Sequence, residues 1–335
     1  MTGFPILRLP ETVREQVLSC MDLVQLVTFS LASSKTKNAV KSLGINALKS
    51  DVYLCEQRIS MTTHFLDTVT VTLRFVVHLV PDQNVRLRNT ATINCIRITS
   101  NSTSDHYSWW NPELGMKEMV NHVNDIFGCV NTCEVQFRDR EEEFDTKILR
   151  DTLPEGTGLF ISRLCEGVFT QKILEHFLSS SRRVTLQCES LTDIQHVAIQ
   201  NLDVLRLRSQ QIPMTLDDFL VCNASYICTG RQTLSSKEIN RFLKHWITGS
   251  NPRLKYINFG MENPDVTLIL KNIPYQSVPE EVERALDKNI TTYSWRSTYR
   301  YFHQTMTGGW DIRNKDGTNA TVTAVQRNVE LVVWD

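Results

Sequence analysis

The chain has 335 residues, of which 41% are hydrophobic and 22% are charged, and its formal net charge is −1. This length leaves room for about two globular domains, and this composition excludes a chain that is disordered throughout. A charge balance so close to zero excludes an overall electrostatic preference for nucleic acid or for an anionic membrane surface.

The nine cysteines stand singly along the chain, without any C-x-x-C pair. We therefore expect reduced thiols, no metal site and no cofactor. Residues 1–20 lack a basic stretch followed by a long apolar run, so no secretory signal is expected. The longest apolar stretch, residues 68–80, includes Arg74 and His78 and is far shorter than the roughly 20 residues that span a bilayer. These features predict a soluble protein of the cytoplasm or the nucleus.

Residues 4–43 predict three short helices. Pro10 is expected at the first helical position, where an amide would be unpaired in any case. Val13 and Val17, followed by Cys20 and Met21, recur at helical steps and share one face of the first helix. A unit of this size rarely buries enough surface to be stable alone, so its apolar side chains need a partner.

The second and third predicted helices each begin with a capping residue. Asp22 and Gln25 fit a capping box at the start of the second helix. Ser33 or Ser34 is placed to cap the third, whose outer face carries three lysines. Taken by its pattern alone, this segment is equally compatible with an amphipathic start of a larger domain.

The ordered elements Leu9-Pro10, Met21-Asp22-Leu23 and Phe29-Ser30 with Ser33-Ser34-Lys35 resemble an F-box. In that family the motif binds the Skp-type adaptor of cullin-RING ubiquitin ligases, so the resemblance implies the same partner here. The residues expected to carry the docking, part interface and part small core, are Leu9, Pro10, Val13, Val17, Leu23, Leu26 and Phe29.

After about residue 50, the spacing of apolar residues changes from a helical period to strict alternation. This pattern predicts strands with one face exposed to solvent. The predicted strands are residues 51–55, 58–61, 69–75 and 92–98. Residues 81–84 are expected to form a turn, and the polar residues 100–106 a surface loop.

From residue 111 onward, predicted helices and strands alternate. Strand centres fall near residues 135, 186, 206 and 257, with further ones near 160 and 227, at steps of roughly 20 to 30 residues. This spacing favours a leucine-rich-repeat-like solenoid, although no strict repeat register recurs and a non-repetitive α/β domain is the alternative. The predicted fold class is therefore α/β, or α+β for the chain as a whole.

The clearest helix is predicted at residues 235–247, with a capping box formed by Ser235 and Glu238 and a left-handed cap at Gly249. Near the C-terminus, Asp316-Gly317 predicts a hairpin and residues 331–334 a last strand. The stretch Glu238–Tyr256 and the closing Gly308–Val322 segment resemble the F-box-associated type 2 domain of nematode F-box proteins. The resulting division is 1–45 for the F-box, 46–110 for a β-rich connecting segment and 111–335 for the associated, target-binding domain.

No catalytic motif is recognisable. A phosphate-binding loop, a nucleophile elbow and a zinc-protease motif are all missing from the sequence. His122, Cys129 and Cys133 are spaced wrongly for zinc. The charged run 139–143 is typical of a solvated surface. Since distant residues can still assemble a site, an enzyme with an unrecognised site stays open as an alternative.

A binding function fits the pattern better. If the solenoid forms, alternate strand residues such as Val135, Leu186 and Leu205 face the core. The intervening residues Gln136, Thr185, Gln187, Arg206 and Arg208 then line an exposed sheet that recognises a target protein. The chain is predicted to be a substrate-recognition adaptor of a cullin-RING (SCF-type) ligase, without catalysis of its own. The alternative is an interaction module that acts outside any ligase.

Overall fold

The computed structural model divides the chain into two compact units, Met1–Gly158 and Leu159–Asp335, which are described separately. The structure describes residues 5–55, 58–65, 70–75, 92–99, 102–110, 116–129, 134–138, 146–152, 158–165, 167–189, 191, 193–209, 212–231, 234–261, 263–287, 305–325 and 327–334. The domain division predicted from the sequence, with limits near residues 45 and 110, stays a prediction.

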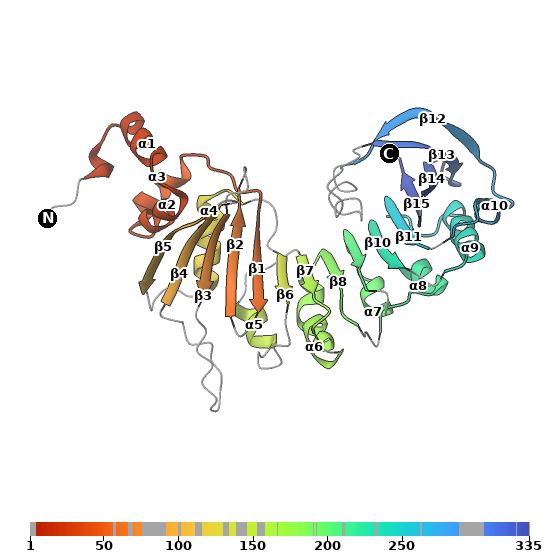
Figure 1. The fold of residues 1–335 in the computed structure, drawn as a ribbon, viewed down its shortest axis with the longest axis horizontal. Coiled ribbons are helices and arrows are strands. Elements are labelled where there is room, and N and C mark those ends of the chain that lie inside the picture. The colour runs from red at the N-terminus through yellow and green to blue at the C-terminus, as the bar shows by residue number, and fades with distance from the viewer. Residues whose placement is uncertain are drawn as a thin grey trace. The chain divides into compact units, whose positions relative to one another are not determined.

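The N-terminal unit opens with a group of short helices, shown in red in Figure 1. They are the 3₁₀ helix η1 (Ile6–Arg8), α1 (Glu11–Ser19), α2 (Leu23–Ser30) and α3 (Ser34–Lys41). The predicted capping box of Asp22 with Gln25 is present, and Ser33, one of the two predicted caps of the third helix, forms a second capping box with Thr36. Pro10 is the N-cap of α1 rather than its first helical residue. This shift of one residue arises because Pro10 has an extended ψ of 149°, which lies outside the helical range.

A β-sheet follows in the same unit. Its strands are β1 (Lys49–Cys55), β2 (Arg58–His64), β3 (Thr70–Phe75), β4 (Thr92–Thr99), β5 (Ser102–Trp110) and β6 (Glu134–Phe137). β1 to β5 form an antiparallel meander, and β6 joins the free side of β1 in parallel. The helices α4 (Met116–Ile126) and α5 (Thr146–Thr152) complete the unit.

The surface loop predicted at residues 100–106 is wrong, because β5 begins at Ser102 and continues to Trp110. The polar residues Ser102 to Ser104 pair with β4, where backbone hydrogen bonds do not depend on apolar side chains. β5 is the last strand on this side of the sheet, and polar residues are common in edge strands. The turn predicted at residues 81–84 lies outside the described residues.

The C-terminal unit begins with strands that alternate with helices. These are β7 (Gly158–Ile161), α6 (Gly167–Phe177), a 3₁₀ turn at Leu178–Ser180, β8 (Arg183–Leu186), α7 (Gln195–Ala198), β9 (Val204–Leu207), α8 (Leu216–Val221), β10 (Tyr226–Arg231), α9 (Ser236–Ile247) and β11 (Tyr256–Gly260). β8 to β11 are parallel neighbours. Figure 1 shows α6 to α9 on one side of these strands. The leucine-rich-repeat-like organisation stays a prediction, while the mixed α/β character is observed.

Antiparallel strands close the C-terminal unit. They are β12 (Gln276–Ala285), β13 (Thr305–Arg313), β14 (Asn319–Val325) and β15 (Asn328–Val333), preceded by the short helix α10 (Val266–Ile269). The sheet order is β11-β15-β14-β13-β12. The hairpin predicted at Asp316-Gly317 is present, with Arg313 paired to Asn319 and Gly317 at a φ of 88°. β12 was not predicted, because its exposed, glutamate-rich residues do not alternate between apolar and polar.

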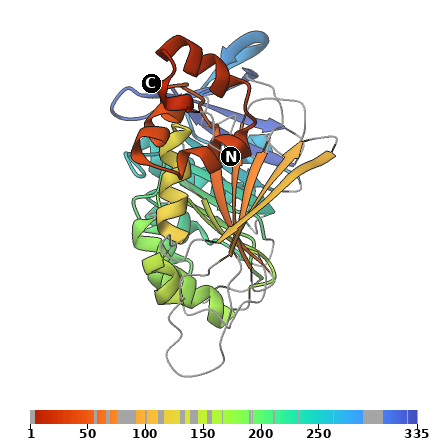
Figure 2. The same cartoon turned by 90° about the vertical axis from the view of Figure 1, so that its left-hand side faces the viewer.

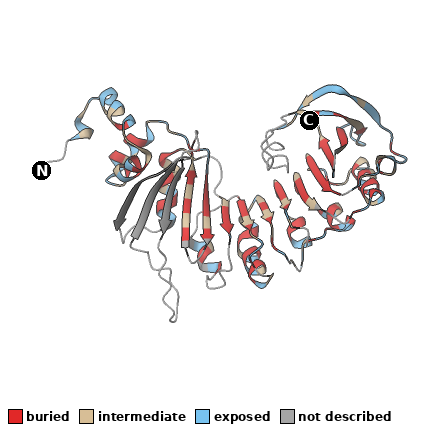
Figure 3. Ribbon diagram, viewed as in Figure 1, coloured by how far each residue is buried: buried red, intermediate tan, exposed pale blue. Residues whose placement is uncertain are grey.

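The core of the C-terminal unit lies between the parallel strands and their helices. The rings of Phe219, Phe242 and Phe259 meet edge to face, with centroids 5.2 to 6.4 Å apart. Trp246 on α9 is 2% exposed and anchors the same core. Figure 3 shows that buried and half-buried residues alternate along several of these strands. One face of β8 and β9 is therefore packed against helices and the other is open.

Candidate protein-binding surfaces

The first helix of the chain presents apolar side chains that nothing in the described structure fully covers. Leu7 and Val13 are 38% and 41% exposed, although both are large hydrophobic residues. Leu9 and Val17 are half-buried, and Pro10 is exposed. An exposed group of apolar residues on one helical unit is typical of a protein-binding surface.

The remaining predicted docking residues lie on α2 and are less accessible. Leu23 and Phe29 are half-buried, whereas Leu26 is only 1% exposed and belongs to the core. Leu18, which is fully buried, anchors α1 in place of Val13. Within the predicted set, Pro10 and Val13 are thus exposed, Leu26 belongs to the core, and the other four residues are half-buried.

The helix α4 supplies the partner that the N-terminal helices need. It contacts both α2 and α3, and Figure 2 shows it in yellow beside the red helices. The buried side chains of this region on α4 and directly after it are Met119, Val120, Val123, Ile126 and Phe127, each at most 1% exposed. The small helical unit is therefore stabilised by a helix that lies about 80 residues later in the chain.

A polar contact between α2 and α4 involves a serine and a histidine. Ser30 Oγ donates to the Val27 carbonyl at 2.7 Å and lies 2.7 Å from His122 Nε2. Because the serine proton is already engaged, the Nε2–H of His122 is the donor in this pair. Burial lowers the pKa of His122, with a smaller contribution from Lys37. The pair fastens two helices and does not activate the serine as a nucleophile, which would require the imidazole to accept its proton.

Two lysines of α3 form ion pairs with a carboxylate of α4. Lys37 Nζ and Lys41 Nζ lie 2.8 and 2.5 Å from the two carboxylate oxygens of Asp125. Hydrogen bonds from Lys37 and then Lys41 lower the pKa of Asp125 to about 2. These groups are partly exposed, so the contribution to stability is modest, but two lysines on one carboxylate fix the direction of α3.

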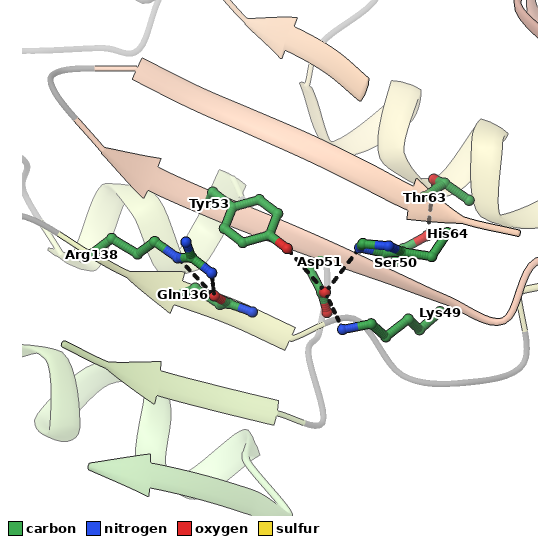
Figure 4. Close-up of polar contacts among 8 residues, drawn as sticks. All are labelled: Lys49, Ser50, Asp51, Tyr53, Thr63, His64, Gln136 and Arg138. Carbon is green, nitrogen blue, oxygen red and sulfur yellow. Dashed lines mark hydrogen bonds and ion pairs between the residues drawn. The ribbon is translucent and has the colours of Figure 1, made fainter. Parts of the chain in front are cut away.

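A buried carboxylate organises the face of the N-terminal sheet shown in Figure 4. The Asp51 side chain on β1 is 1% exposed and receives Lys49 Nζ at 2.6 Å. The Tyr53 hydroxyl donates to it at 3.2 Å, and His64 Nε2 of β2 lies 3.3 Å away. Burial and then the Asp51 charge raise the pKa of Tyr53 well above its usual value, so the phenol remains a donor.

Asp51→Asn is expected to destabilise the protein by roughly 1–3 kcal/mol at pH 7, since it removes charge-assisted hydrogen bonds from a buried site. Burial alone raises the pKa of Asp51, but His64 and Lys49 outweigh it and lower the pKa below 3.8. A carboxyl whose pKa is lower in the folded state stabilises the protein above about pH 4, and this contribution is lost as the pH falls through the folded pKa. In urea unfolding, the difference in free energy of unfolding between wild type and variant should therefore decrease from pH 7 to pH 3. An unchanged gap would mean that Asp51 is uncharged in the folded state.

Gln136 is buried rather than exposed, which corrects its predicted place on an open surface. It is 6% exposed, because Arg138 folds back over this part of the sheet. The Arg138 guanidinium donates from Nε and Nη2 to Gln136 Oε1 at 2.9 and 2.7 Å, and it lies 4.5 Å from the centre of the Tyr53 ring. Alternation along β6 placed Gln136 on the correct face but could not show that another side chain covers it.

The other four predicted target-binding residues come together on the C-terminal unit. Thr185 on β8 lies directly opposite Arg206 on β9 in the parallel register. Gln187 and Arg208 follow two residues later on the same face. Thr185, Gln187 and Arg206 are half-buried and Arg208 is exposed, whereas the intervening residues of both strands pack against the helices. Their role in binding a target stays a prediction.

Two asparagines with a structural role are absent from the predicted set. Asn251, at a φ of 52°, donates to the carbonyls of Phe219 and Cys222 at the end of α8. Asn240 on α9 donates to the carbonyls of Ile269 and Lys271 at the end of α10. Both satisfy carbonyls that a helix end leaves unpaired. A polar residue within the apolar stripe of α9 was the available signal for Asn240.

The described residues contain no group of three or more His, Cys, Asp or Glu side chains placed to hold a metal ion. His122 and Cys129 of the set considered for zinc are described, and His122 instead contacts Ser30. Cys133 lies outside the described residues. Among the helices that the structure describes, none is both long and apolar enough to cross a membrane.

Comparisons with known proteins match two segments of the chain. A family model described as F-box domain matches residues 6–48, and a model described as F-box associated matches residues 193–259. The F-box associated domain-containing protein sdz-33 of Caenorhabditis elegans is 39% identical over 67 residues, which are 18% of this chain and 22% of that protein. No solved structure matches the chain.

The first match covers the exposed apolar surface described above, and the second includes Arg206 and Arg208 but not Thr185 and Gln187. The first covers the helices η1 to α3 with their exposed apolar residues, and the second covers β9 to β11 with α8 and α9. The chain matches only 22% of the length of the curated relative, so the relative supports the associated domain and not the whole protein. The chain therefore contains a segment similar to an F-box at its N-terminal helices and a segment similar to an F-box associated domain in its C-terminal unit, a pairing that supports a nematode-type F-box protein.

Proposed function

We propose that this protein is a substrate-recognition subunit of a cullin-RING (SCF-type) ubiquitin ligase. Residues 4–43 dock on the Skp-type adaptor, and the C-terminal unit holds a target protein. The protein performs no chemistry itself. It raises the effective concentration of a target lysine near the activated ubiquitin, in the cytoplasm or the nucleus.

The observation that carries this proposal is the exposed apolar surface within the F-box match. Leu7 and Val13 remain open to solvent there, next to the half-buried Leu9 and Val17. Burying such side chains in an interface is favourable at about 25 cal/mol per Å² of apolar surface, before the costs of association. The helix α4 packs against α2 and α3, so these two helices of the unit are already ordered without the adaptor, which lowers the cost of binding.

A double variant, Leu9→Ala with Pro10→Ala, tests the docking role. It should weaken binding of the purified Skp-type adaptor at least tenfold in isothermal titration calorimetry, since both side chains lie on the proposed interface. A matched control is Ile199→Ala with Val221→Ala, which truncates apolar residues that are 54% and 46% exposed on the C-terminal unit. The control should bind like wild type. Equal affinities for all three proteins would contradict the docking role of this surface.

A further inference from the structure

The chain passes from the N-terminal helices into the sheet without a spacer. The F-box match ends at the residue directly before β1. Two backbone hydrogen bonds hold the chain at this point. The Ala47 amide donates to the carbonyl of Phe127, directly after α4, and the Leu48 amide donates to the carbonyl of His64 in β2, both at 2.8 Å. Residues 47–51 are called the junction below.

Side chains join the junction to β2 on both faces of the sheet. The Asp51 side chain is 1% exposed, and His64 Nε2 lies 3.3 Å from its carboxylate, as Figure 4 shows. On the opposite face, the hydroxyl groups of Ser50 and Thr63 lie 3.1 Å apart, and both residues are buried. A hydrogen bond to an ionised carboxylate is about twice as strong as one between neutral groups. The contact of Asp51 with His64 is therefore the stronger of the two links.

The N-terminal helices have a second attachment, which is separate from the junction. The helix α4 packs against α2 and α3. Its residues His122 and Asp125 form the polar contacts with Ser30 and Lys37 described above. Helices that touch along one line can still rock about that line. A second attachment at the junction, to a strand rather than to α4, removes this freedom.

We infer that Asp51 and His64 are positioning residues that fix the orientation of the N-terminal helices relative to the N-terminal sheet. Lys49 shares the same carboxylate, but it lies on the same strand as Asp51 and so does not join two strands. His64 crosses from β2 to β1 through its side chain, and its carbonyl also holds the Leu48 amide. One residue therefore holds the junction through both its side chain and its backbone.

The consequence for a ligase rests on the proposed function. Transfer of ubiquitin by proximity depends on geometry, because a displacement of about 1 Å between reacting groups can cost roughly 100-fold in rate. Helices that dock on the adaptor but swing relative to the rest of the chain would lower the effective concentration of a target lysine. A fixed junction transmits the position of the docked helices to the N-terminal sheet.

Pulsed electron paramagnetic resonance of the full chain measures this orientation. Lys35 on α3 and Asp151 on α5 are both exposed. Each is replaced by azidophenylalanine and coupled to a spin label, which leaves the native cysteines unmodified. The otherwise wild-type chain should give one narrow distance distribution, with the adaptor bound or absent. His64→Ala should widen this distribution at least about 1.5-fold, because the junction then opens locally.

Two matched variants separate positioning from a general effect on the carboxylate. His64→Gln keeps a side-chain N–H donor and should restore the narrow distribution. Lys49→Ala removes a donor to the same carboxylate from within β1, so the width should stay within about 1.2-fold of wild type. All three variants should bind the adaptor within about twofold of wild type, since none of these residues belongs to the proposed interface.

Hydrogen exchange of the wild type gives a further test that requires no variant to fold. The peptide that contains the Ala47 and Leu48 amides should exchange at least about 100-fold more slowly than an unstructured peptide. Rapid exchange there would overturn the inference. So would an unchanged width in folded His64→Ala, equal widening by Lys49→Ala, or failure of His64→Gln to restore the width. None of these results depends on the adaptor, so a fixed junction in a chain that does not bind the adaptor would contradict the proposed function alone.

Discussion

Phe127→Ala is expected to lower the free energy of unfolding by about 3–5 kcal/mol, because the Phe127 side chain is fully buried and its loss leaves a cavity. Its ring packs edge to face against Phe65, with centroids 4.9 Å apart. Its carbonyl accepts a hydrogen bond from the Ala47 amide at 2.8 Å, where the chain leaves the N-terminal helices. Urea denaturation should show a lower midpoint with a similar slope.

The same variant should weaken adaptor binding, because it loosens the region that supports the F-box helices. Phe242→Ala is the matched control, since Phe242 is also fully buried but lies in the C-terminal unit. Both variants should lose comparable stability, and adaptor affinity is compared at a temperature at which both are folded. If Phe127→Ala weakens adaptor binding no more than Phe242→Ala does, the supporting role assigned to this region is wrong.

Val13→Asp is expected to reduce affinity for the Skp-type adaptor about 100-fold or more, because it would bury a carboxylate in an apolar interface without a partner. The folded chain should tolerate the change. Val13 is 41% exposed, so its replacement should alter the free energy of unfolding by only about 0.5 kcal/mol. An acidic residue in the first turn of α1 also suits the helix dipole. Calorimetric titration of adaptor into the variant gives the affinity.

Val221→Asp provides the control for this substitution. Val221 is 46% exposed at the end of α8, so the same chemical change occurs at similar exposure on the C-terminal unit. Wild-type affinity for the adaptor is expected. Retention of full affinity by Val13→Asp, in a sample that is folded, would exclude the exposed face of α1 from the interface.

Short sequence motifs predicted those features that depend only on interactions between neighbouring residues, namely helix caps and a turn. Asp22 and Ser235 begin helices because each side chain accepts hydrogen bonds from backbone amides two or three residues later in the chain. Asp316-Gly317 turns a hairpin because Gly317 adopts a positive φ. Such features require only neighbouring residues, so a single sequence contains the information.

Long-range partners could not be predicted in the same way. The contact of Ser30 with His122 joins residues 92 positions apart, and no periodicity reports it. The strand β5 was missed because its pairing with β4 outweighs the weak strand propensity of its first, polar residues. β12 was missed because Arg284 binds Asp311 of β13 through two hydrogen bonds, a tertiary contact between residues 27 positions apart.

The candidate binding residues show the same division. Alternation predicted that Thr185, Gln187, Arg206 and Arg208 share one face of the sheet, and the parallel register places Thr185 beside Arg206. The register depends on how strands pair, which the sequence pattern does not specify. Gln136 was misjudged because the position of Arg138 above it is a tertiary contact. A periodic pattern therefore indicates the face of a strand, and only the packed structure indicates which residues stay accessible.

The central claim is that this protein joins a cullin-RING ligase through a Skp-type adaptor. The most direct measurement is size-exclusion chromatography of the purified full chain with purified cullin, in the presence and absence of the adaptor. We predict that the chain elutes with the cullin, at one-to-one-to-one stoichiometry, only when the adaptor is present. A folded chain that never elutes with the cullin, or one that does so without the adaptor, would contradict this claim.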